Sequence, residues 1–383
     1  MYSDTIQVNE YSYSWLQRGF DWIYSKEVKK KKGTIAPGSW VSIQSPQGTF
    51  MGIGIWCEGD IVCRRFSTQK ESPQNIIERA LREALERRPS FGTEECWRWI
   101  HAENDSLPGV RIDVWGLEYV ITLATKALRV LLPFLLKAIA KLRPAKAIWG
   151  YIRTKEIESL GLLDGKGAPD GLWVYELGLK YWVEPSRSPD AGIFGDMREL
   201  RAWLSPYWKG KDVLNLFCFT GAFSVSALAG GAQRVCSVDL SSPYIDWVKK
   251  NIEGNGLTVS EDCLVVSDAN KALERFRRKQ ELFDIVIADP PSFSHGDGLW
   301  SVERDLSSLV LRCLRCLRPK GMLVVATNHG KMSPKDFSKA ILQASYKENR
   351  PLRILKQYSP SIDHPAALSF PESRYLKCWV LQG

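Results

Sequence analysis

The sequence has no apolar stretch long enough to cross a lipid bilayer. The longest such run, Val130–Leu136, is interrupted by Pro133 and flanked by Lys126, Arg129 and Lys137, whereas a membrane helix needs about 20 consecutive apolar residues. The sequence also has no cleavable signal, no internal repeat and no low-complexity tract. We therefore expect no membrane insertion, and we interpret the run as an amphipathic helix.

Cysteine occurs nine times, but without the spacing of a metal site. Cys313 and Cys316 have C-x-x-C spacing within the helical run Leu309–Leu317, and no second pair completes a zinc set. We expect these two residues on a buried helix face and predict no metal site. Scattered cysteines without a secretion signal are typical of the reducing cytoplasm.

Acidic residues are outnumbered by basic ones. The chain has 52 Lys and Arg against 43 Asp and Glu, which leaves a net charge of +9 and favours a polyanionic partner. Its 383 residues with 44% hydrophobic content can bury more than one core. Together with 15 tryptophans, the basic segments favour an RNA-binding surface. These segments are Lys29–Lys32, Arg64–Arg65, Lys209 with Lys211, and Arg277–Lys279.

Strands and helices alternate along the second half of the chain. Each apolar run of strand length ends in a polar tip and is followed by a helical pattern, which predicts a parallel sheet with ligands beyond the carboxyl ends of its strands. The predicted strands are Val213–Phe217, Arg234–Val238, Cys263–Ser267 and the run that begins at Phe283. The predicted helices are Ala222–Ala229, Tyr244–Asn255 and Ala269–Lys279.

Asp239, Asp268 and Asp289 follow three of these strands and should lie at one edge of the sheet. Gly221 and Asp239 are 18 positions apart, close to the spacing at which an acid binds a ribose hydroxyl in nucleotide-binding folds. The intervening loop lacks the G-x-G-x-x-G phosphate cradle, so a nucleoside cofactor without phosphates fits better. S-adenosyl-L-methionine is such a cofactor. The alternative is that these aspartates are helix N-caps.

The segment Asp289-Pro290-Pro291-Ser292-Phe293 suggests where a substrate ring is held. A carboxylate, two rigid prolines and an aromatic ring at the end of a buried strand make a slot for a flat base beside a cofactor. We predict Asp289, Pro290, Pro291 and Phe293 as part of a methyl-transfer site.

Several motifs together resemble the bacterial large-subunit rRNA methyltransferases of the cytosine-C5 type I family. In the second half these are Asn215-Leu-Phe-Cys-Phe-Thr-Gly221, Gly230-Gly231, Ser237-Val-Asp239, Asn255-Gly-Leu257 and Asp289–Phe293. In the first half, Gly19–Tyr24, Pro37-Gly38 and the strand-like stretch Trp40–Arg65 resemble that family's PUA module, an RNA-binding barrel. Glu103–Val110 with Asp113 resembles the opening of its central domain, and Asp363-His364-Pro365 and Tyr375-Leu-Lys377 are similar to its closing strands.

The resemblance implies an α/β fold in three parts. These are a β-rich PUA-like barrel at 1–75, a connecting helix with a small α+β central domain at 76–185, and a Rossmann-like class I methyltransferase domain at 186–383. It implies ribosomal RNA of the large subunit or its precursor as the partner, and leaves the oligomeric state open, with a homodimer as one option. The implied cofactor contacts are Phe194, Arg198, Asn215, Phe217, Thr220, Gly221, Asp239, Asp268 and Asp289.

One position departs from the cytosine-C5 pattern. In that family the strand after the segment resembling Pro319-Lys-Gly321 ends close to a nucleophilic cysteine, but here it ends in Thr327-Asn328-His329-Gly330. Methylation of cytosine C5 normally needs a thiolate that adds to C6. Asn328 looks more like the guanine-N7 rRNA methyltransferases, in which a ring nitrogen attacks the methyl group directly. Cys218 is the nearest rival nucleophile.

We therefore predict a cytoplasmic, S-adenosylmethionine-dependent rRNA methyltransferase that modifies a ring nitrogen, with Asn328 hydrogen-bonded to the base and Phe293 stacked on it. Cytosine-C5 methylation is the runner-up. A non-catalytic RNA-binding assembly factor is the alternative of another class, and a small-molecule methyltransferase leaves the N-terminal module without a purpose. The sequence does not decide whether His295, His329 or Cys218 takes part in the chemistry.

Overall fold

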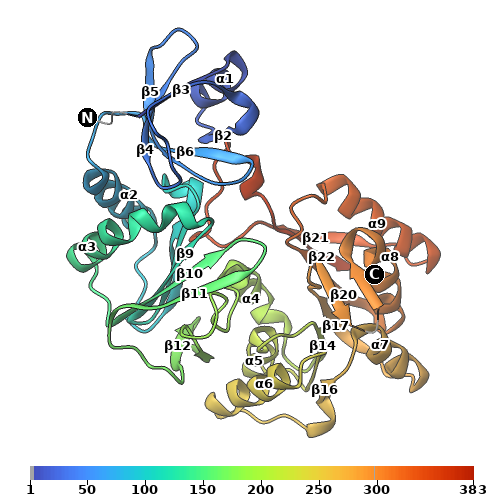
Figure 1. Ribbon diagram of the computed structural model, residues 1–383. Helices are drawn as coiled ribbons and strands as arrows, with labels where there is room; N and C mark the ends of the chain where they lie inside the picture. The colour runs from blue at the N-terminus through green and yellow to red at the C-terminus, as the bar shows by residue number, and fades with distance from the viewer. Residues whose placement is uncertain (1–3, 297) are drawn as a thin grey trace. The chain divides into compact units, whose positions relative to one another are not determined.

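The computed structural model describes residues 4–296 and 298–383, which form two compact units (Figure 1). Unit 1 contains the chain up to Val174 together with Val183–Ala191 and Ile362–Ser373. Unit 2 contains Tyr175–Trp182, Gly192–Ser361 and Arg374–Gly383. Among the described residues, no helix combines the length and the apolar character needed to cross a membrane.

The N-terminal part of unit 1 is a six-stranded sheet with the order β2-β6-β5-β4-β1-β3. Alternate residues of its strands point into a core that includes Ile6, Val8, Val41 and Ile43. Helix α1 (Glu10–Gln17) begins at Asn9, whose side chain accepts the backbone N–H of Ser12 and so satisfies one free donor of the first turn. The strands are β1 (Thr5–Val8), β2 (Trp22–Tyr24), β3 (Val28–Lys32), β4 (Trp40–Gln44), β5 (Phe50–Trp56) and β6 (Ile61–Ser67).

A second sheet in unit 1, with the order β11-β10-β9-β8-β7, packs against helices α2 (Pro73–Arg87) and α3 (Leu132–Leu142). Ser72 caps α2, and Ile76, Ile77, Ala80, Leu81 and Ala84 form its buried stripe at helical spacing. Pro133 lies in the first turn of α3, where a missing N–H costs nothing. The strands are β7 (Cys96–His101), β8 (Val110–Trp115), β9 (Glu118–Leu123), β10 (Ala147–Arg153) and β11 (Ile157–Gly165).

Unit 2 is built on a seven-stranded sheet with the order β16-β15-β14-β17-β20-β22-β21, in which β14, β17 and β20 lie side by side (Figure 1). The first five strands are mutually parallel and β22 runs antiparallel to both of its neighbours. The predicted parallel sheet is therefore confirmed. The strands are β14 (Asp212–Leu216), β15 (Arg234–Asp239), β16 (Leu264–Val266), β17 (Phe283–Ala288), β20 (Leu317–Thr327), β21 (Arg353–Tyr358) and β22 (Lys377–Gln382).

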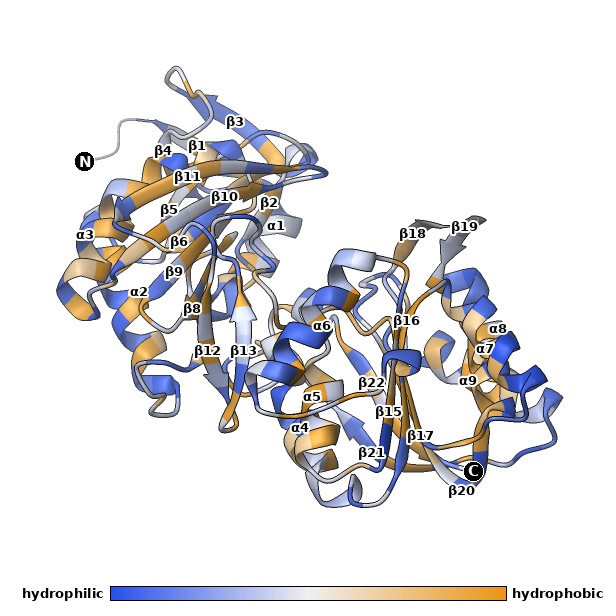
Figure 2. Cartoon of the chain, turned by 90° about the horizontal axis from the view of Figure 1, so that it is seen from below, coloured by the Kyte–Doolittle hydropathy of each residue, from blue (hydrophilic) through white to orange (hydrophobic). Residues whose placement is uncertain are grey.

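Both faces of this sheet are covered by helices, which explains its continuous apolar strands. On one face, Val213, Val235 and Ile285 pack with α4 and α5, and on the other, Leu214, Cys236 and Val286 pack with α7, α8 and α9. Figure 2 shows β17 as predominantly hydrophobic, whereas α6 carries many hydrophilic residues. The helices are α4 (Arg198–Leu204), α5 (Ala222–Ala229), α6 (Ser242–Gly254), α7 (Ala269–Arg278), α8 (Val302–Arg315) and α9 (Pro334–Lys347).

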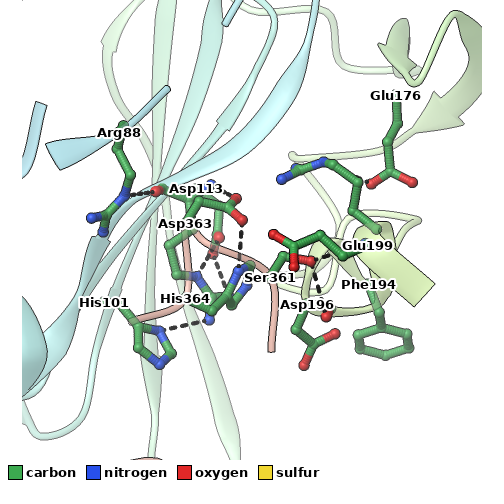
Figure 3. Close-up of polar contacts among 12 residues, drawn as sticks. Arg88, His101, Asp113, Glu176, Phe194, Asp196, Glu199, Ser361, Asp363 and His364 are labelled. Carbon is green, nitrogen blue, oxygen red and sulfur yellow. Dashed lines mark hydrogen bonds and ion pairs between the residues drawn. The ribbon is translucent and has the colours of Figure 1, made fainter. Parts of the chain in front are cut away.

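One expected strand is absent from its place. Asp363-His364-Pro365 forms a turn in unit 1, and only Lys377 of the other closing motif opens a strand, β22. The Asp363 carboxylate accepts the backbone N–H of Arg98 at 2.8 Å and lies 3.2 Å from Nδ1 of His364. Figure 3 shows this buried polar group with Arg88, His101 and Asp113 around it. The Asp363 side chain thus satisfies the backbone N–H of Arg98 from a turn, without strand pairing at this position.

Candidate functional site

The loop between β14 and α5 has an unusual backbone. Phe217, Phe219 and Gly221 all have positive φ, at 54°, 51° and 83°. Such a conformation is strained for phenylalanine and persists where the surrounding structure enforces it, often at functional sites. At Gly221 an added Cβ would lie 2.8 Å from Cγ1 of Val248, so only glycine fits there. The predicted cofactor loop is therefore a strained turn at the carboxyl end of the sheet.

Asp239, the last residue of β15, holds this loop in place. Its Oδ2 accepts the backbone N–H of Phe219 at 3.0 Å, and its Oδ1 accepts that of Ser241 at 3.0 Å. Burial raises the pKa of the Asp239 carboxyl, and these backbone N–H donors oppose that shift. A carboxylate has about four acceptor positions, so each oxygen keeps room for a ribose hydroxyl after these bonds.

Asp268 is the N-cap of helix α7, the alternative left open by the sequence. Its Oδ1 accepts the backbone N–H of Asn270 at 2.9 Å and of Lys271 at 3.1 Å. These two hydrogen bonds show that the Asp268 side chain caps the helix. It still places a carboxylate at the same sheet edge as Asp239, because β15 and β16 are parallel neighbours.

Asn215 and Thr220 are buried anchors of the same loop. The side-chain amide of Asn215 donates to Oγ of Ser224 at 2.9 Å, and this hydroxyl lies 2.7 Å from that of Ser237. The Thr220 hydroxyl donates to the carbonyl of Gly192, and the Thr220 carbonyl accepts from the Asn251 side chain at 2.8 Å. Both predicted cofactor contacts thus have defined protein partners that fix the loop.

The segment Gly192–Arg198 lies beside this loop. Phe194 is 43% exposed and its ring centroid is 5.0 Å from that of Phe219. Arg198, which we predicted as a cofactor contact, is buried, with Nε 3.3 Å from Oε2 of Glu176. The side chains of Glu176 and Phe194 are labelled in Figure 3.

Arg201 was not predicted from the sequence, but it also supports this segment. Its Nε donates to Oε1 of Glu176 at 2.7 Å, and its Nη2 donates to the carbonyl of Phe194 at 2.9 Å. The side chain is only 2% exposed. A buried arginine is tolerated when a carboxylate pairs with it and its N–H groups are satisfied. In the sequence, the one sign of this role is that Arg201 lies three positions after Arg198, on the same side of a helix.

Asp289 follows β17, and Asp196 is a like-charged neighbour of its carboxyl. Burial raises the pKa of Asp289 to about 7, the negative charge of Asp196 adds to the shift, and Arg201 opposes it. Asp196 itself is fixed by the Tyr375 hydroxyl, which donates to its Oδ2 at 2.7 Å. In the described part of the chain, no hydrogen bond to the Asp289 carboxyl is formed, so it is free to accept from a ligand.

The residues after Asp289 are held from two sides. Trp300 donates from Nε1 to the carbonyl of Pro291 at 2.8 Å, and the Ser292 hydroxyl donates to Oδ1 of Asn328 at 3.1 Å. Phe293 opens β18 (Phe293–Gly296), which pairs with β19 (Gly298–Ser301), and its ring is 62% exposed. The side chain of His295 lies outside the described residues.

The end of β20 presents Asn328 between two buried neighbours. Thr327 and His329 are buried, whereas Asn328 is exposed. Because β17 and β20 are parallel neighbours, with Ala288 paired to Val325, Asn328 and the Asp289–Phe293 segment meet at one edge. The structure thus brings together the residues predicted to hold the base.

No reactive thiol is exposed near this edge among the described residues. All nine cysteines are buried. Burial raises the pKa of the Cys218 thiol well above its usual value, and the charge of Asp239 raises it further. Burial does the same for Cys378, which pairs with Ala326 of β20 and also has Asp289 as a charged neighbour. Both thiols are therefore kept protonated and poorly nucleophilic.

The chain matches two protein-family models. Residues 160–366 match the S-adenosylmethionine-dependent methyltransferase model, and residues 6–68 match a PUA-like domain. This confirms the predicted methyltransferase fold, its cofactor S-adenosyl-L-methionine, and the N-terminal PUA-like barrel. The crystal structure of SMU.776, described as a methyltransferase and complexed with SAH, superposes with a TM-score of 0.88 at 25% identity, covering 99% of this chain and 100% of that one.

Curated relatives match along almost the whole chain. A protein of Pseudoalteromonas translucida named ribosomal RNA large subunit methyltransferase I is 32% identical, covering 94% of this chain and 95% of its own. A protein of the same name from Cronobacter sakazakii is 31% identical with the same coverage. The resemblance to large-subunit rRNA methyltransferases that the motifs indicated is thereby confirmed, whereas the cytosine-C5 subtype stays a prediction. The chain belongs to the family of S-adenosylmethionine-dependent methyltransferases that contains the proteins named ribosomal RNA large subunit methyltransferase I.

Proposed function

We propose that this enzyme transfers the methyl group of S-adenosylmethionine to a ring nitrogen of a base in 23S rRNA, in the manner of a guanine-N7 methyltransferase. The names of the curated relatives and the PUA-like domain support rRNA as the substrate. The exposed lysines Lys29–Lys32 of β3 provide a surface for its phosphates. The proposal places the reaction in the cytoplasm, where rRNA is assembled into subunits.

The cofactor is held, in this proposal, by the strained loop and the acids at the edge of the sheet. Asp239 uses its remaining acceptor positions for the ribose hydroxyls, and Phe194 and Phe219 supply apolar surface next to it. Asp289, whose carboxyl accepts no hydrogen bond from the described residues, accepts from the cofactor or from the base. When bound, the cofactor supplies an electrophilic methyl group on a positively charged sulfur.

The single observation that carries the nitrogen target is the residue at the end of β20. Asn328 is exposed there, next to Ser292 and Phe293, and the nearby thiols of Cys218 and Cys378 are buried and protonated. A ring nitrogen attacks with its own lone pair, so an N–CH₃ bond forms as the S–CH₃ bond breaks and the positive charge moves to the base. No proton has to leave, and catalysis reduces to positioning.

Cytosine C5 is the second candidate, because the sequence motifs along the chain resemble the cytosine-C5 type I family. This reaction needs a thiolate that adds to C6 and is later released as a base removes the C5 proton. Cys218 is the thiol to test, since it lies in the cofactor loop. A non-catalytic assembly factor would bind rRNA without transferring a methyl group.

The test is nucleoside mass spectrometry of 23S rRNA incubated with the purified enzyme and methyl-labelled S-adenosylmethionine. Naked rRNA and assembled large subunits are compared as substrates. We expect label in 7-methylguanosine or another ring-nitrogen product, and unchanged label with Cys218→Ser. Label in 5-methylcytidine that disappears with Cys218→Ser would replace the proposal with the cytosine-C5 reaction. Cofactor binding without label in any rRNA would favour the assembly factor.

A further inference from the structure

His329 is the buried neighbour of the exposed Asn328, and it is bonded to the start of helix α8. Its Nε2 lies 2.9 Å from Oε1 of Glu303, and the histidine side chain is 8% exposed against 52% for the glutamate. A carboxylate only accepts hydrogen bonds, so Nε2 carries the proton in this pair. Glu303 lies in the first turn of α8, where the helix dipole stabilises a negative charge.

The backbone around Asn328 is fixed by further bonds. The His329 N–H donates to Oγ1 of Thr327 at 3.2 Å, and Nζ of the buried Lys377 donates to the His329 carbonyl at 2.7 Å. The His329 ring also meets the ring of Phe293 edge-to-face, with centroids 5.3 Å apart and planes at 84°. His329 therefore adjoins both residues of the proposed base site, because it follows Asn328 in the chain and its imidazole packs against Phe293.

We infer that the Glu303–His329 pair is a positioning device that sets Asn328 and Phe293 at the distance required to grip a flat base between an amide and an aromatic ring. Glu303 fixes the tilt of the imidazole, the imidazole supports the Phe293 ring, and Lys377 fixes the backbone that carries Asn328. In this role Glu303 and His329 act through Asn328 and Phe293 and need no contact with the reacting atoms. The inference rests on the proposed function, since it assumes that Asn328 and Phe293 bind the base.

This arrangement predicts an effect on turnover rather than on cofactor binding. Phosphate contacts supply most of the affinity of a protein for RNA, whereas a misplaced base lowers the rate of the transfer itself. Losing one hydrogen bond to a charged group costs about tenfold or more in the affected step. We expect Glu303→Ala to lower kcat by about tenfold, with unchanged affinity for S-adenosylmethionine and little change in KM for RNA.

The first readout does not depend on activity. In hydrogen exchange followed by mass spectrometry on the full-length protein, Glu303→Ala should speed the exchange of the segment 327–332 while leaving β14 and β15 unchanged. Glu303→Gln keeps an oxygen that accepts from Nε2–H and should restore the protection and the turnover. Glu348→Ala is the control. It removes the carboxylate that lies 2.7 Å from Nε of Arg315, at the opposite end of α8, and should change neither the exchange of 327–332 nor the turnover.

The second readout is a mutant cycle. If Glu303 acts through the placement of Asn328 and Phe293, adding Glu303→Ala to a variant that carries both Asn328→Ala and Phe293→Ala should lower kcat by no more than about twofold further. Unchanged exchange in Glu303→Ala, or losses in kcat that multiply, would overturn the inference. A wild-type enzyme that binds the cofactor but labels no rRNA contradicts the proposed function instead, and hydrogen exchange still decides the positioning.

Discussion

At the scale of single residues, Asp289 is a carboxyl group whose charge changes near neutral pH. Burial and the charge of Asp196 raise its pKa from 3.8 to about 7. The folded state therefore holds a proton that the unfolded chain has already lost at pH values between these two. By linkage, the free energy of unfolding is unaffected by this group below the unfolded pKa and falls as pH rises through the folded one.

The same titration predicts a pH dependence of methyl transfer. If the ionised form of Asp289 accepts a hydrogen bond in the site, kcat/KM should rise with pH through about 7. Asp196→Asn removes the like charge and should shift this limb to lower pH. Asp289→Asn should remove the limb along with most activity. An unshifted limb in Asp196→Asn would show that another group controls it.

Asp239 and Asp268 separate cofactor binding from helix capping. Asp239→Ala removes the proposed ribose acceptor and the anchor of Phe219, and we expect the affinity for S-adenosylmethionine to fall by about tenfold or more, by calorimetry. Asp268→Asn keeps the N-cap oxygen and should change neither stability nor affinity. Full affinity in Asp239→Ala would refute its ribose role, and weakened binding in Asp268→Asn would assign its charge to the cofactor.

At the scale of elements, the strands and helices around the site follow from local patterns. The predicted helix Ala222–Ala229 has the same bounds in the structure, and the strand that begins at Phe283 ends at Ala288, directly before Asp289. Such elements are predictable because apolar periodicity and the Gly and Asp punctuation act over a few residues. The positive φ of Phe217 and Phe219 was not predictable, because phenylalanine has no intrinsic preference for it and only tertiary contacts enforce it.

The conformation of the cofactor loop can be tested at Gly221. Gly221→Ala combines positive φ with a Cβ placed 2.8 Å from Val248, so we expect a loss of more than about 1 kcal/mol in unfolding free energy and weaker cofactor binding. Gly256→Ala at the end of α6 is the matched control, since φ is +67° there and no atom lies within 4 Å. It should cost stability by strain alone and leave cofactor affinity intact. Equal cofactor affinity in both variants would show that the loop tolerates the shift.

At the scale of the whole molecule, the sequence predicts the kinds of domain better than their limits. We expected a central domain at 76–185, but Tyr175–Trp182 belongs to unit 2 and Ile362–Ser373 to unit 1. Glu176 explains why Tyr175–Trp182 belongs to unit 2, because its carboxylate pairs with Arg201 of α4. Contacts between residues distant in sequence leave no local pattern. A lone glutamate after an apolar strand therefore gave no signal of its buried partner.

The net charge of +9 includes a run of four lysines, and the structure shows that all four are exposed. Lys29–Lys32 are exposed on β3, the edge strand of the first sheet, and Lys31 lies over the ring of Trp56 at 4.1 Å. Within the described residues, no ion pair involves any of these lysines. Lysines on an edge strand also prevent unwanted strand pairing, so their charge and their exposure allow two roles that an experiment can separate.

If these lysines contact phosphates, replacing Lys29, Lys30 and Lys32 by glutamine should weaken rRNA binding and flatten its dependence on salt. Each lost phosphate contact lowers the slope of log K against log salt by about 0.7 to 0.9. The control carries the same change of charge in unit 1, as Lys126→Gln, Arg129→Gln and Lys141→Gln, which neutralise side chains already paired with Glu158 or Glu78. Filter binding at several salt concentrations measures both slopes. Equal slopes for the two triple variants would mean that net charge alone attracts the RNA, whereas self-association of the β3 variant would assign its lysines to the protection of the sheet edge.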